Sequence, residues 1–243
     1  MPEPKLIDVY ALPEAENVCE QILREIIRLE RFSMAHVTME PGDASLLHQH
    51  SGMNEIYLVT EGSGILYHGD EELEVERGAY LVVPSGRPHK LRNSSGGYLE
   101  HLVFAIPPFD PENVELLDNA GYEPKKTRRF QYTVEPKVAL DNIEIRELIP
   151  EEERQRLGIS LAYGFVQEEK ESRPHKHEES EELFYVVDGS GKVVINDRSY
   201  EVRKGSVVYI PTGFYHSLAA GRDQLIALSI QSPPYKKEDF HLL

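Results

Sequence analysis

Hydrophobic positions along the chain come in short runs that are rich in β-branched and aromatic residues, which is typical of β-strands. The clearest runs are residues 56–59, 80–83, 183–187 and 207–210. Turn signals stand between such runs. They are Gly-Ser-Gly at 62–64 and 189–191, and the pairs Gly69-Asp70 and Asn196-Asp197. Many short strands separated by frequent turns predict an all-β sandwich or barrel.

Two segments fit this pattern less well. In residues 17–31 four apolar side chains follow a helical stripe, so the pattern leaves helix and strand open. They are Val18, Ile22, Ile26 and Leu29. Residues 107–136 are rich in proline and charge, and we interpret them as a linker between two domains. The basic run at 125–129 is interpreted as a solvated part of that linker.

The strand pattern occurs twice along the chain. A shift of 127 residues superimposes residues 48–91 on 175–218 without a gap, and 15 of the 44 positions are identical. The identical positions include four residues of metal-ligand type. They are His48 with His175, His50 with His177, Glu55 with Glu182, and His89 with His216. This register predicts a duplicated unit, with one domain in residues 1–118 and a second in residues 119–243.

Composition narrows the classes of partner. The chain has 243 residues, of which 42 are acidic and 26 basic, giving a formal charge of −16. This balance argues against nucleic acid and anionic membranes as partners. The single cysteine, Cys19, excludes an intrachain disulfide and fits the reducing cytoplasm. No secretory signal and no apolar run of about 18 residues is visible, so we expect a cytoplasmic protein without a membrane span.

Each copy carries three histidines and one glutamate in a spacing that can gather them at one point. His48 and His50 are two residues apart, so both side chains leave a strand on the same face. Glu55 follows after a short loop, and His89 follows the turn at 84–86. Burying these polar groups without partners is costly, and a divalent cation removes that cost. The donor set suits a transition ion; an octahedral ion keeps two open positions, whereas tetrahedral zinc is closed.

These spacings resemble the two signature motifs of the cupin superfamily. The first copy reads Gly42-x5-His48-x-His50-x4-Glu55-x6-Gly62, followed by Gly78-x5-Pro84-x-Gly86-x2-His89-x3-Asn93. The second copy repeats both motifs, except that Glu169 replaces the leading glycine and Ala220 the trailing asparagine. The resemblance implies two tandem cupin barrels of the double-stranded β-helix, or jelly-roll, type, each with a metal near its wider mouth.

The predicted ligands form two sets of four side chains, and we expect Fe(II) or Mn(II) in them, with Ni, Co, Cu or Zn also compatible. The sets are His48, His50, Glu55 and His89, and His175, His177, Glu182 and His216. Glu181 competes with Glu182 by position, but the repeat register favours Glu182. The remaining histidines considered have no histidine counterpart in the other copy and are predicted not to be ligands. They are His68, His101 and His241.

Strand parity suggests further residues of the first site. Tyr57 lies two positions after Glu55 and is expected to share its inward face. On residues 32–40, either Met34, His36 and Thr38 or their neighbours face inward. Tyr57 and His36 are therefore candidate proton donors, and ordinary packing is the alternative for both.

The resemblance does not select one reaction, because the superfamily includes dioxygenases, decarboxylases, isomerases and binding proteins. We favour a dioxygenase-type oxidoreductase acting on a small oxygenated organic substrate. The alternatives are a metal-dependent isomerase or decarboxylase of a sugar or keto acid, and a small-molecule-binding protein without turnover. The resemblance also implies a homo-oligomer, and we expect a dimer.

Overall fold

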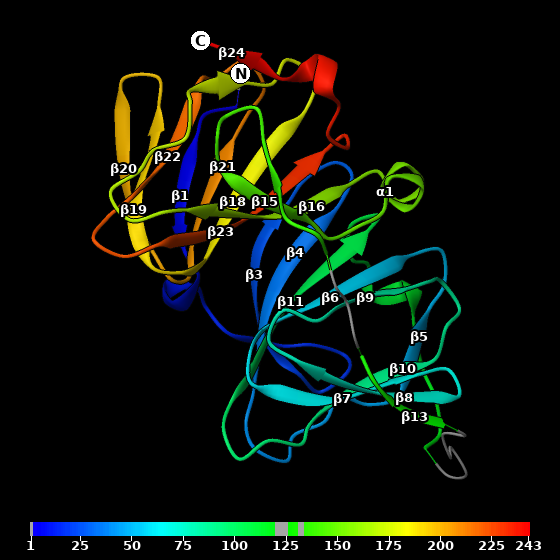
Figure 1. Ribbon diagram of the computed structural model, residues 1–243. Coiled ribbons are helices and arrows are strands. Elements are labelled where there is room, and N and C mark those ends of the chain that lie inside the picture. Colours follow the sequence, from blue (N-terminus) through cyan, green and yellow to red (C-terminus); the bar gives the residue numbers. More distant parts are fainter. Residues whose placement is uncertain (1, 120–125, 131–133) are drawn as a thin grey trace. The chain divides into compact units, whose positions relative to one another are not determined.

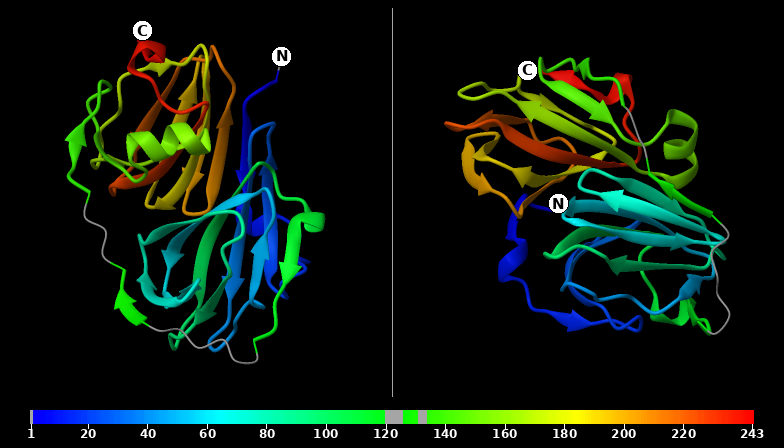
Figure 2. Two further views of the ribbon diagram at one scale, coloured as in Figure 1. Left: turned by 90° about the vertical axis from the view of Figure 1, so that its right-hand side faces the viewer. Right: turned by 60° about the horizontal axis from the view of Figure 1, so that its bottom comes forward.

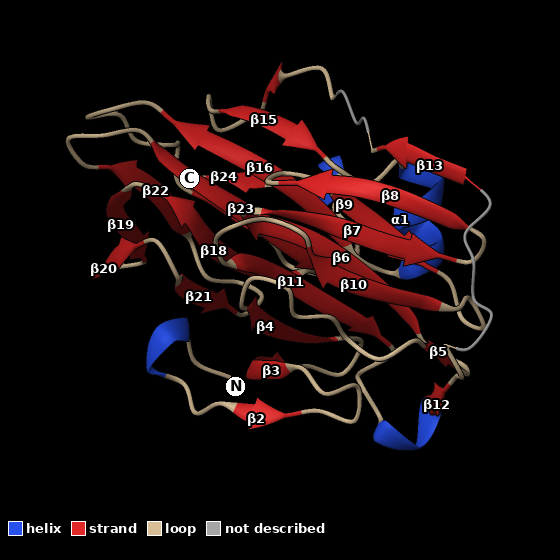
Figure 3. Ribbon diagram, turned by 90° about the horizontal axis from the view of Figure 1, so that it is seen from below, coloured by secondary structure: helices blue, strands red, loops and turns tan. Residues whose placement is uncertain are grey.

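The computed structural model describes residues 2–119, 126–130 and 134–243, and strands dominate it (Figures 1 and 3). The chain divides into two compact units. Residues 12–132 form the N-terminal unit, and residues 133–243 together with 1–11 form the C-terminal unit. The sequence-based division at residue 118 does not anticipate that the first eleven residues belong with the second half. No helix in the described ranges is long and apolar enough to cross a membrane.

The N-terminal unit contains two sheets whose buried side chains share one core. One sheet has the order β2 (Ala15–Glu16), β3 (Ile22–Arg28), β4 (Ser33–Met39), β11 (Leu99–Ile106), β6 (Asn54–Glu61) and β9 (Tyr80–Val83). The other has the order β12 (Val114–Leu116), β5 (His48–His50), β10 (His89–Asn93), β7 (Ser63–His68), β8 (Glu71–Glu76) and β13 (Lys126–Arg129). Neighbouring strands are antiparallel, apart from β13, which is parallel to β8.

The C-terminal unit repeats this arrangement. Its larger sheet has the order β1 (Lys5–Asp8), β21 (Ser206–Ile210), β18 (Glu181–Asp188), β23 (Leu225–Ser232), β16 (Ser160–Val166), β15 (Glu144–Glu147) and β14 (Lys137–Val138). Its smaller sheet has the order β20 (Arg198–Arg203), β19 (Ser190–Ile195), β22 (His216–Ala220), β17 (His175–Lys176) and β24 (His241–Leu242). In both views of Figure 2 the last residues stay at one end of this unit. The predicted all-β class with two jelly rolls is confirmed.

Helical structure in the described residues is limited to short pieces. They are α1 (Glu151–Leu157) and the 3₁₀ turns η1 (Val9–Ala11), η2 (Pro111–Asn113) and η3 (Lys237–Asp239). The helix α1 ends where Gly158 takes the left-handed conformation, and the described part of the N-terminal unit contains no α-helix.

Parts of the segments at 17–31 and 107–136 form strands. Residues 22–28 form β3, because pairing with β4 satisfies their backbone groups and overrides a weak helical stripe. Residues 111–116 and 126–129 of the predicted linker add η2, β12 and β13 to the N-terminal unit. Residues 126–129 are exposed, as expected for a solvated run, but they pair with β8, and Arg128 and Arg129 face Glu71 and Glu76. The rest of the linker prediction at 120–125 and 131–133 lies outside the described residues.

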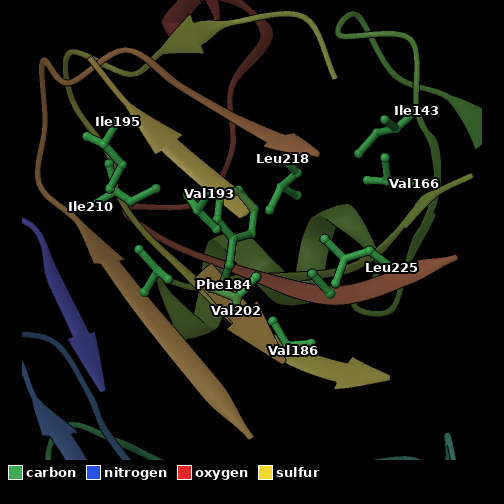
Figure 4. Packing of buried hydrophobic residues seen from close by; sticks show 12 residues of the cluster. Ile143, Val166, Phe184, Val186, Val193, Ile195, Val202, Ile210, Leu218 and Leu225 are labelled. Carbon is green, nitrogen blue, oxygen red and sulfur yellow. The ribbon is translucent and has the colours of Figure 1, made fainter. Parts of the chain in front are cut away.

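The cores lie between the two sheets of each unit. In the C-terminal unit Phe184 of the larger sheet packs against Val193 and Leu218 of the smaller one (Figure 4). In the N-terminal unit Tyr57 takes the place of Phe184 and joins the equivalent cluster. Side chains on alternate positions of each strand fill this interior, so a polar residue on the same face is forced into the core as well.

Two glycines make the Gly-Ser-Gly turns possible. Gly62 and Gly189 have φ angles of 77° and 79°. A Cβ atom on Gly62 would lie 2.3 Å from the carbonyl oxygen of Tyr98, and one on Gly189 would lie 2.1 Å from that of Gln224. A residue with a side chain is therefore excluded at both positions unless the backbone shifts.

We expect Gly189→Ala to lower the free energy of unfolding by more than about 2 kcal/mol, because it combines a positive φ with a backbone clash. Gly96→Ala is the matched control, since nothing lies within 4 Å of its Cβ position. Chemical denaturation of both variants checks this prediction, and equal stability losses would contradict it.

A second prediction concerns His101, which lies in β11 and stacks on Tyr57 with ring centroids 5.3 Å apart. It is completely buried and neither ring nitrogen has a hydrogen-bond partner among the described residues. Burial, with a smaller contribution from His36, lowers the pKa of His101 to about 3. The unfolded chain therefore binds this proton below about pH 6.5 while the folded chain does not, and stability falls as pH decreases towards 3.

As pH falls from 6.5 to 4.5, the free energy of unfolding of His101→Phe should therefore increase by about 2–3 kcal/mol relative to that of the parent protein. Urea denaturation of both proteins in metal-free buffer across this range measures the difference. A difference that does not change with pH would contradict the assignment.

Candidate metal centres

The histidines of each set meet through strand register. Residue His48 of β5 lies directly opposite His89 of β10, and His175 of β17 lies opposite His216 of β22. His50 lies on the same face of β5 as His48, and His177 follows two positions after His175. The antiparallel pairing of two short strands thus places three imidazoles side by side in each unit.

The glutamate comes from the other sheet of the same unit. Glu55 lies in β6, and its Oε2 atom is 3.0 Å from Nε2 of His50 and 3.1 Å from Nε2 of His89. Glu182 lies in β18, and its Oε2 atom is 2.9 Å from Nε2 of His216 and 3.4 Å from Nε2 of His177. Each set therefore bridges the two sheets at the interior of its unit.

Backbone carbonyl groups orient most of the imidazoles. The Nδ1 atoms of five histidines each lie 2.8–3.2 Å from a carbonyl oxygen, which can only accept a hydrogen bond. They are His48, His89, His175, His177 and His216. This interaction keeps the proton on Nδ1 and leaves Nε2 unprotonated. Nε2 of His177 also lies 3.1 Å from Nε2 of Gln231, whose N–H can only donate to it. Five of the six histidines are at most 3% exposed, and His175 is 5% exposed. The two glutamates are 3–4% exposed.

The donor atoms converge on one point in each unit. One ligand atom from every member of a set lies within 4.8 Å of the others, and all eight residues are buried. Three of these buried atoms have no hydrogen-bond partner among the described residues. They are Nε2 of His50, Oε2 of Glu182 and Nε2 of His216. Unpaired donors facing one another at this distance fit a transition ion with nitrogen and oxygen ligands.

The protonation states agree with this reading. Burial acts to raise the pKa of Glu55, but the adjacent His50 and His89 hold it well below its usual range. Glu182 is held low in the same way. Burial, followed by a neighbouring imidazole, lowers the pKa of His48 to about 4 and that of His175 to about 3. Burial acts to lower the pKa of His177, but the adjacent Glu182 raises it above its usual value. An anionic carboxylate beside a neutral imidazole such as that of His48 or His175 is the form that binds a cation.

Each set borders a cavity. In the N-terminal unit a cavity of about 270 Å³ is lined by His48, His50, Glu55 and Tyr57 among mostly apolar neighbours. In the C-terminal unit a cavity of about 290 Å³ reaches His175 and Glu182. Both sizes lie near the lower end of the range for small-molecule sites.

The other predicted site residues fall into two groups. Tyr57 lines the cavity, and its ring centroid is 5.7 Å from that of His89. His36 does not line it; Ala35 and Val37 of the same strand do, and Nε2 of His36 lies 3.3 Å from Glu100 instead. The proton-donor role of His36 stays a prediction, and this cavity gives it no support. Glu181 is hydrogen-bonded to the hydroxyl of Tyr209 and lies outside the ligand set.

A segment that covers each donor set was not predicted from the sequence. After the cis peptides at Pro107 and Pro233, the chain turns through η2 or η3, and β12 or β24 pairs with the first histidine strand. In the C-terminal unit Phe240 stacks on His175, with ring centroids 4.1 Å apart. A signal was available, because Pro-Pro followed by an aromatic residue occurs at 107–109 and 233–235, a shift of 126 rather than 127.

Asp239 holds the segment with η3 and β24 in place over the donor set of the C-terminal unit. Its carboxylate accepts hydrogen bonds from the backbone N–H groups of Glu178, Glu179 and Ser180 at 2.7–3.0 Å. Its carbonyl oxygen is 3.1 Å from Nδ1 of His177, so the same residue also orients a predicted ligand. The cover and the metal centre are thus held by one group of contacts.

Two curated proteins align with parts of the chain. An uncharacterized protein of Methanocaldococcus jannaschii is 32% identical over 112 residues, which are 46% of this chain and 90% of that protein. The oxalate-binding protein of Thermotoga maritima is 29% identical over 72 residues, which are 30% of this chain and 60% of that protein.

Solved structures resemble the chain over nearly its whole length. Oxalate decarboxylase from Lactobacillus farciminis superimposes with a TM-score of 0.74 and 18% identity, covering 98% of this chain and 88% of that one. Salicylate 1,2-dioxygenase from Pseudaminobacter salicylatoxidans gives a TM-score of 0.72 and 14% identity, with coverages of 95% and 84%. At these identities the likeness concerns the fold. Because the sequence model of the Cupin domain matches residues 35–104 and 164–230, the chain belongs to the cupin family, with one such domain in each half.

Proposed function

We propose that the chain is a metal-dependent oxidoreductase of the dioxygenase type, whose substrate chelates the ion through two adjacent oxygen atoms. The observation that carries this proposal is the position of each donor set beside a cavity. Four protein donors leave two positions of an octahedral ion for other ligands. The cavity gives a small organic molecule access to those positions.

The eight predicted ligands would hold one ion in each unit, and Fe(II) or Mn(II) suits the donors. When bound, such an ion supplies Lewis acidity, which lowers the pKa of a chelated hydroxyl group. The carbonyl oxygens behind the histidines, such as that of Leu46 behind His48, hold Nδ1 and would leave Nε2 available to a bound ion.

Tyr57 is the residue of the N-terminal cavity that we propose as proton donor. Burial, followed by the charge of Glu55, raises the pKa of Tyr57 well above its usual value, so the phenol keeps its proton at neutral pH. The apolar side chains of Val37 and Val103 line the same cavity and limit the entry of water. Phe184 replaces Tyr57 in the C-terminal unit, so this proton donor exists in one site only.

The names of the similar proteins support the proposed kind of substrate. Oxalate carries two adjacent carboxylates, and salicylate carries a carboxylate next to a hydroxyl group, so both can chelate an ion through two oxygens. Oxalate and salicylate appear in the names of those similar proteins and are not thereby assigned to this chain. For this chain they define the compounds to test first.

Binding without turnover is the second candidate, and the oxalate-binding protein of Thermotoga maritima favours it. Decarboxylation is a further alternative, because the chain shares its fold with the oxalate decarboxylase of Lactobacillus farciminis. Product analysis with the same compounds separates these functions. The cytoplasmic location and the dimeric state stay predictions.

Metal analysis tests the two centres. We expect close to two divalent ions per chain at full loading, and His50→Ala and His177→Ala should each remove about one, because each loses a ligand of a different set. His241→Ala is the control, since His241 is exposed and outside both sets. Elemental analysis of the purified proteins measures this, and an unchanged metal content in both ligand variants would contradict the assignment.

Oxygen uptake tests the reaction. Protein loaded with Fe(II) or Mn(II) should consume O₂ with an enediol, a flavonol or a catechol-like chelator, and Tyr57→Phe should lower turnover at least about 100-fold while retaining its metal. An oxygen electrode and metal analysis provide both readings. Absence of uptake with every compound, together with calorimetric binding of oxalate or salicylate, would favour the binding protein instead.

A further inference from the structure

The two centres differ in the residues that pair with the glutamate and with the residue two positions after it. In the N-terminal unit Glu55 pairs with Ala105, and Tyr57 pairs with Val103, between β6 and β11. In the C-terminal unit Glu182 pairs with Gln231, and Phe184 pairs with Ser229, between β18 and β23. The ligands are the same in both units, but the strand facing the carboxylate changes from apolar to polar.

In the C-terminal centre two side chains hold one oxygen of the carboxylate. The hydroxyl of Ser229 donates to Oε1 of Glu182 at 2.6 Å, and Nε2 of Gln231 donates to the same oxygen at 3.1 Å. The amide nitrogen is assigned to this contact because an ionised carboxylate can only accept. Oε2 of Glu182 is left facing His177 and His216.

In the N-terminal centre neither Val103 nor Ala105 can donate a hydrogen bond. The hydroxyl next to the carboxylate comes instead from Tyr57, on the strand of the glutamate itself. Oε2 of Glu55 faces His50 and His89. Among the residues that the structure describes, Glu55 therefore has one hydroxyl donor, whereas Glu182 has a hydroxyl and an amide that both donate to Oε1.

We propose that Ser229 and Gln231 are positioning residues that fix Glu182 as a ligand through one oxygen, so that the C-terminal centre binds its metal more tightly than the N-terminal one. Two donors on Oε1 restrict rotation of the carboxylate before the ion arrives, which reduces the ordering that binding requires. Glu55, which lacks this pair, keeps more freedom to turn. Removing groups that orient a ligand typically weakens metal binding by about 10–100-fold. This inference rests on the proposed metal binding.

Single-centre proteins make the comparison direct. His50→Ala leaves the C-terminal centre, and His177→Ala leaves the N-terminal one. Titration of Mn(II) against a competing chelator should give a lower Kd for the C-terminal centre. In the His50→Ala protein, Ser229→Val with Gln231→Ala introduces the residues of the other unit and should raise Kd about 10–100-fold. The EPR spectrum of bound Mn(II) should change as well, because the carboxylate is no longer held through one oxygen.

Matched variants separate positioning from simple damage to the fold. Ser229→Thr keeps the hydroxyl and should retain tight binding in the otherwise unchanged centre. Ser229→Val places a side chain of nearly the same shape as threonine there, without the hydroxyl, and should weaken binding. In the His177→Ala protein, Tyr57→Phe with Val103→Ser and Ala105→Gln introduces the residues of the C-terminal unit into the N-terminal centre. These substitutions should lower its Kd for Mn(II). Thermal unfolding without metal checks that every variant is folded.

The outcomes distinguish this inference from the function on which it rests. Metal binding in the His50→Ala protein with a Kd that Ser229→Val and Gln231→Ala leave unchanged would overturn the role of the two residues alone. Equal losses for Ser229→Thr and Ser229→Val would overturn it too. If neither single-centre protein binds Mn(II), the proposed metal centres fail, and this inference fails with them.

Discussion

A carboxylate buried against three imidazoles is the interaction on which the rest of each unit depends. Glu55 and Glu182 lie at the interior of a β-sandwich, where an unpaired charge is expensive. Opposed histidines on the facing sheet offset that cost, and they can do so only if β5 registers with β10 and β17 with β22. Strand register, turn geometry and the covers after β11 and β23 all serve to keep these donors at one point.

The duplicated units keep the donors and change what surrounds them. Two positions after the glutamate, Tyr57 changes to Phe184, and the residue opposite it changes from Val103 to Ser229. A hydroxyl group is therefore retained but moves to the neighbouring strand. This exchange leaves a phenol in one cavity and none in the equivalent place of the other. The two sets of four potential ligands therefore differ in whether a phenol lies beside them and in the hydrogen bonds to the carboxylate.

Departures from the family motif affect loops rather than donors. Asn93 uses its amide to reach the carbonyl oxygens of Met39, Glu40 and Gly97, and thereby closes a loop beside β10. Ala220 cannot do this, but its backbone N–H donates to the carbonyl of Lys170 just as that of Asn93 donates to Asp43. In the C-terminal unit Gly221 also donates to the carbonyl of Ser190. Glu169, in place of the leading glycine, still adopts a positive φ of 54°. Neither change displaces a histidine or a glutamate.

The sequence by itself determined the all-β class, the duplication and the four residues that gather in each half, because these follow from local strand patterns and from spacing within a hairpin. It left the segment at 22–28 open and assigned 111–116 and 126–129 to a linker. Only the tertiary structure decided that these residues complete sheets, that residues 5–8 join β21, and that Tyr57 rather than His36 enters a cavity. Pairing between strands distant in the chain, and the face that a strand presents, depend on contacts that no local pattern encodes.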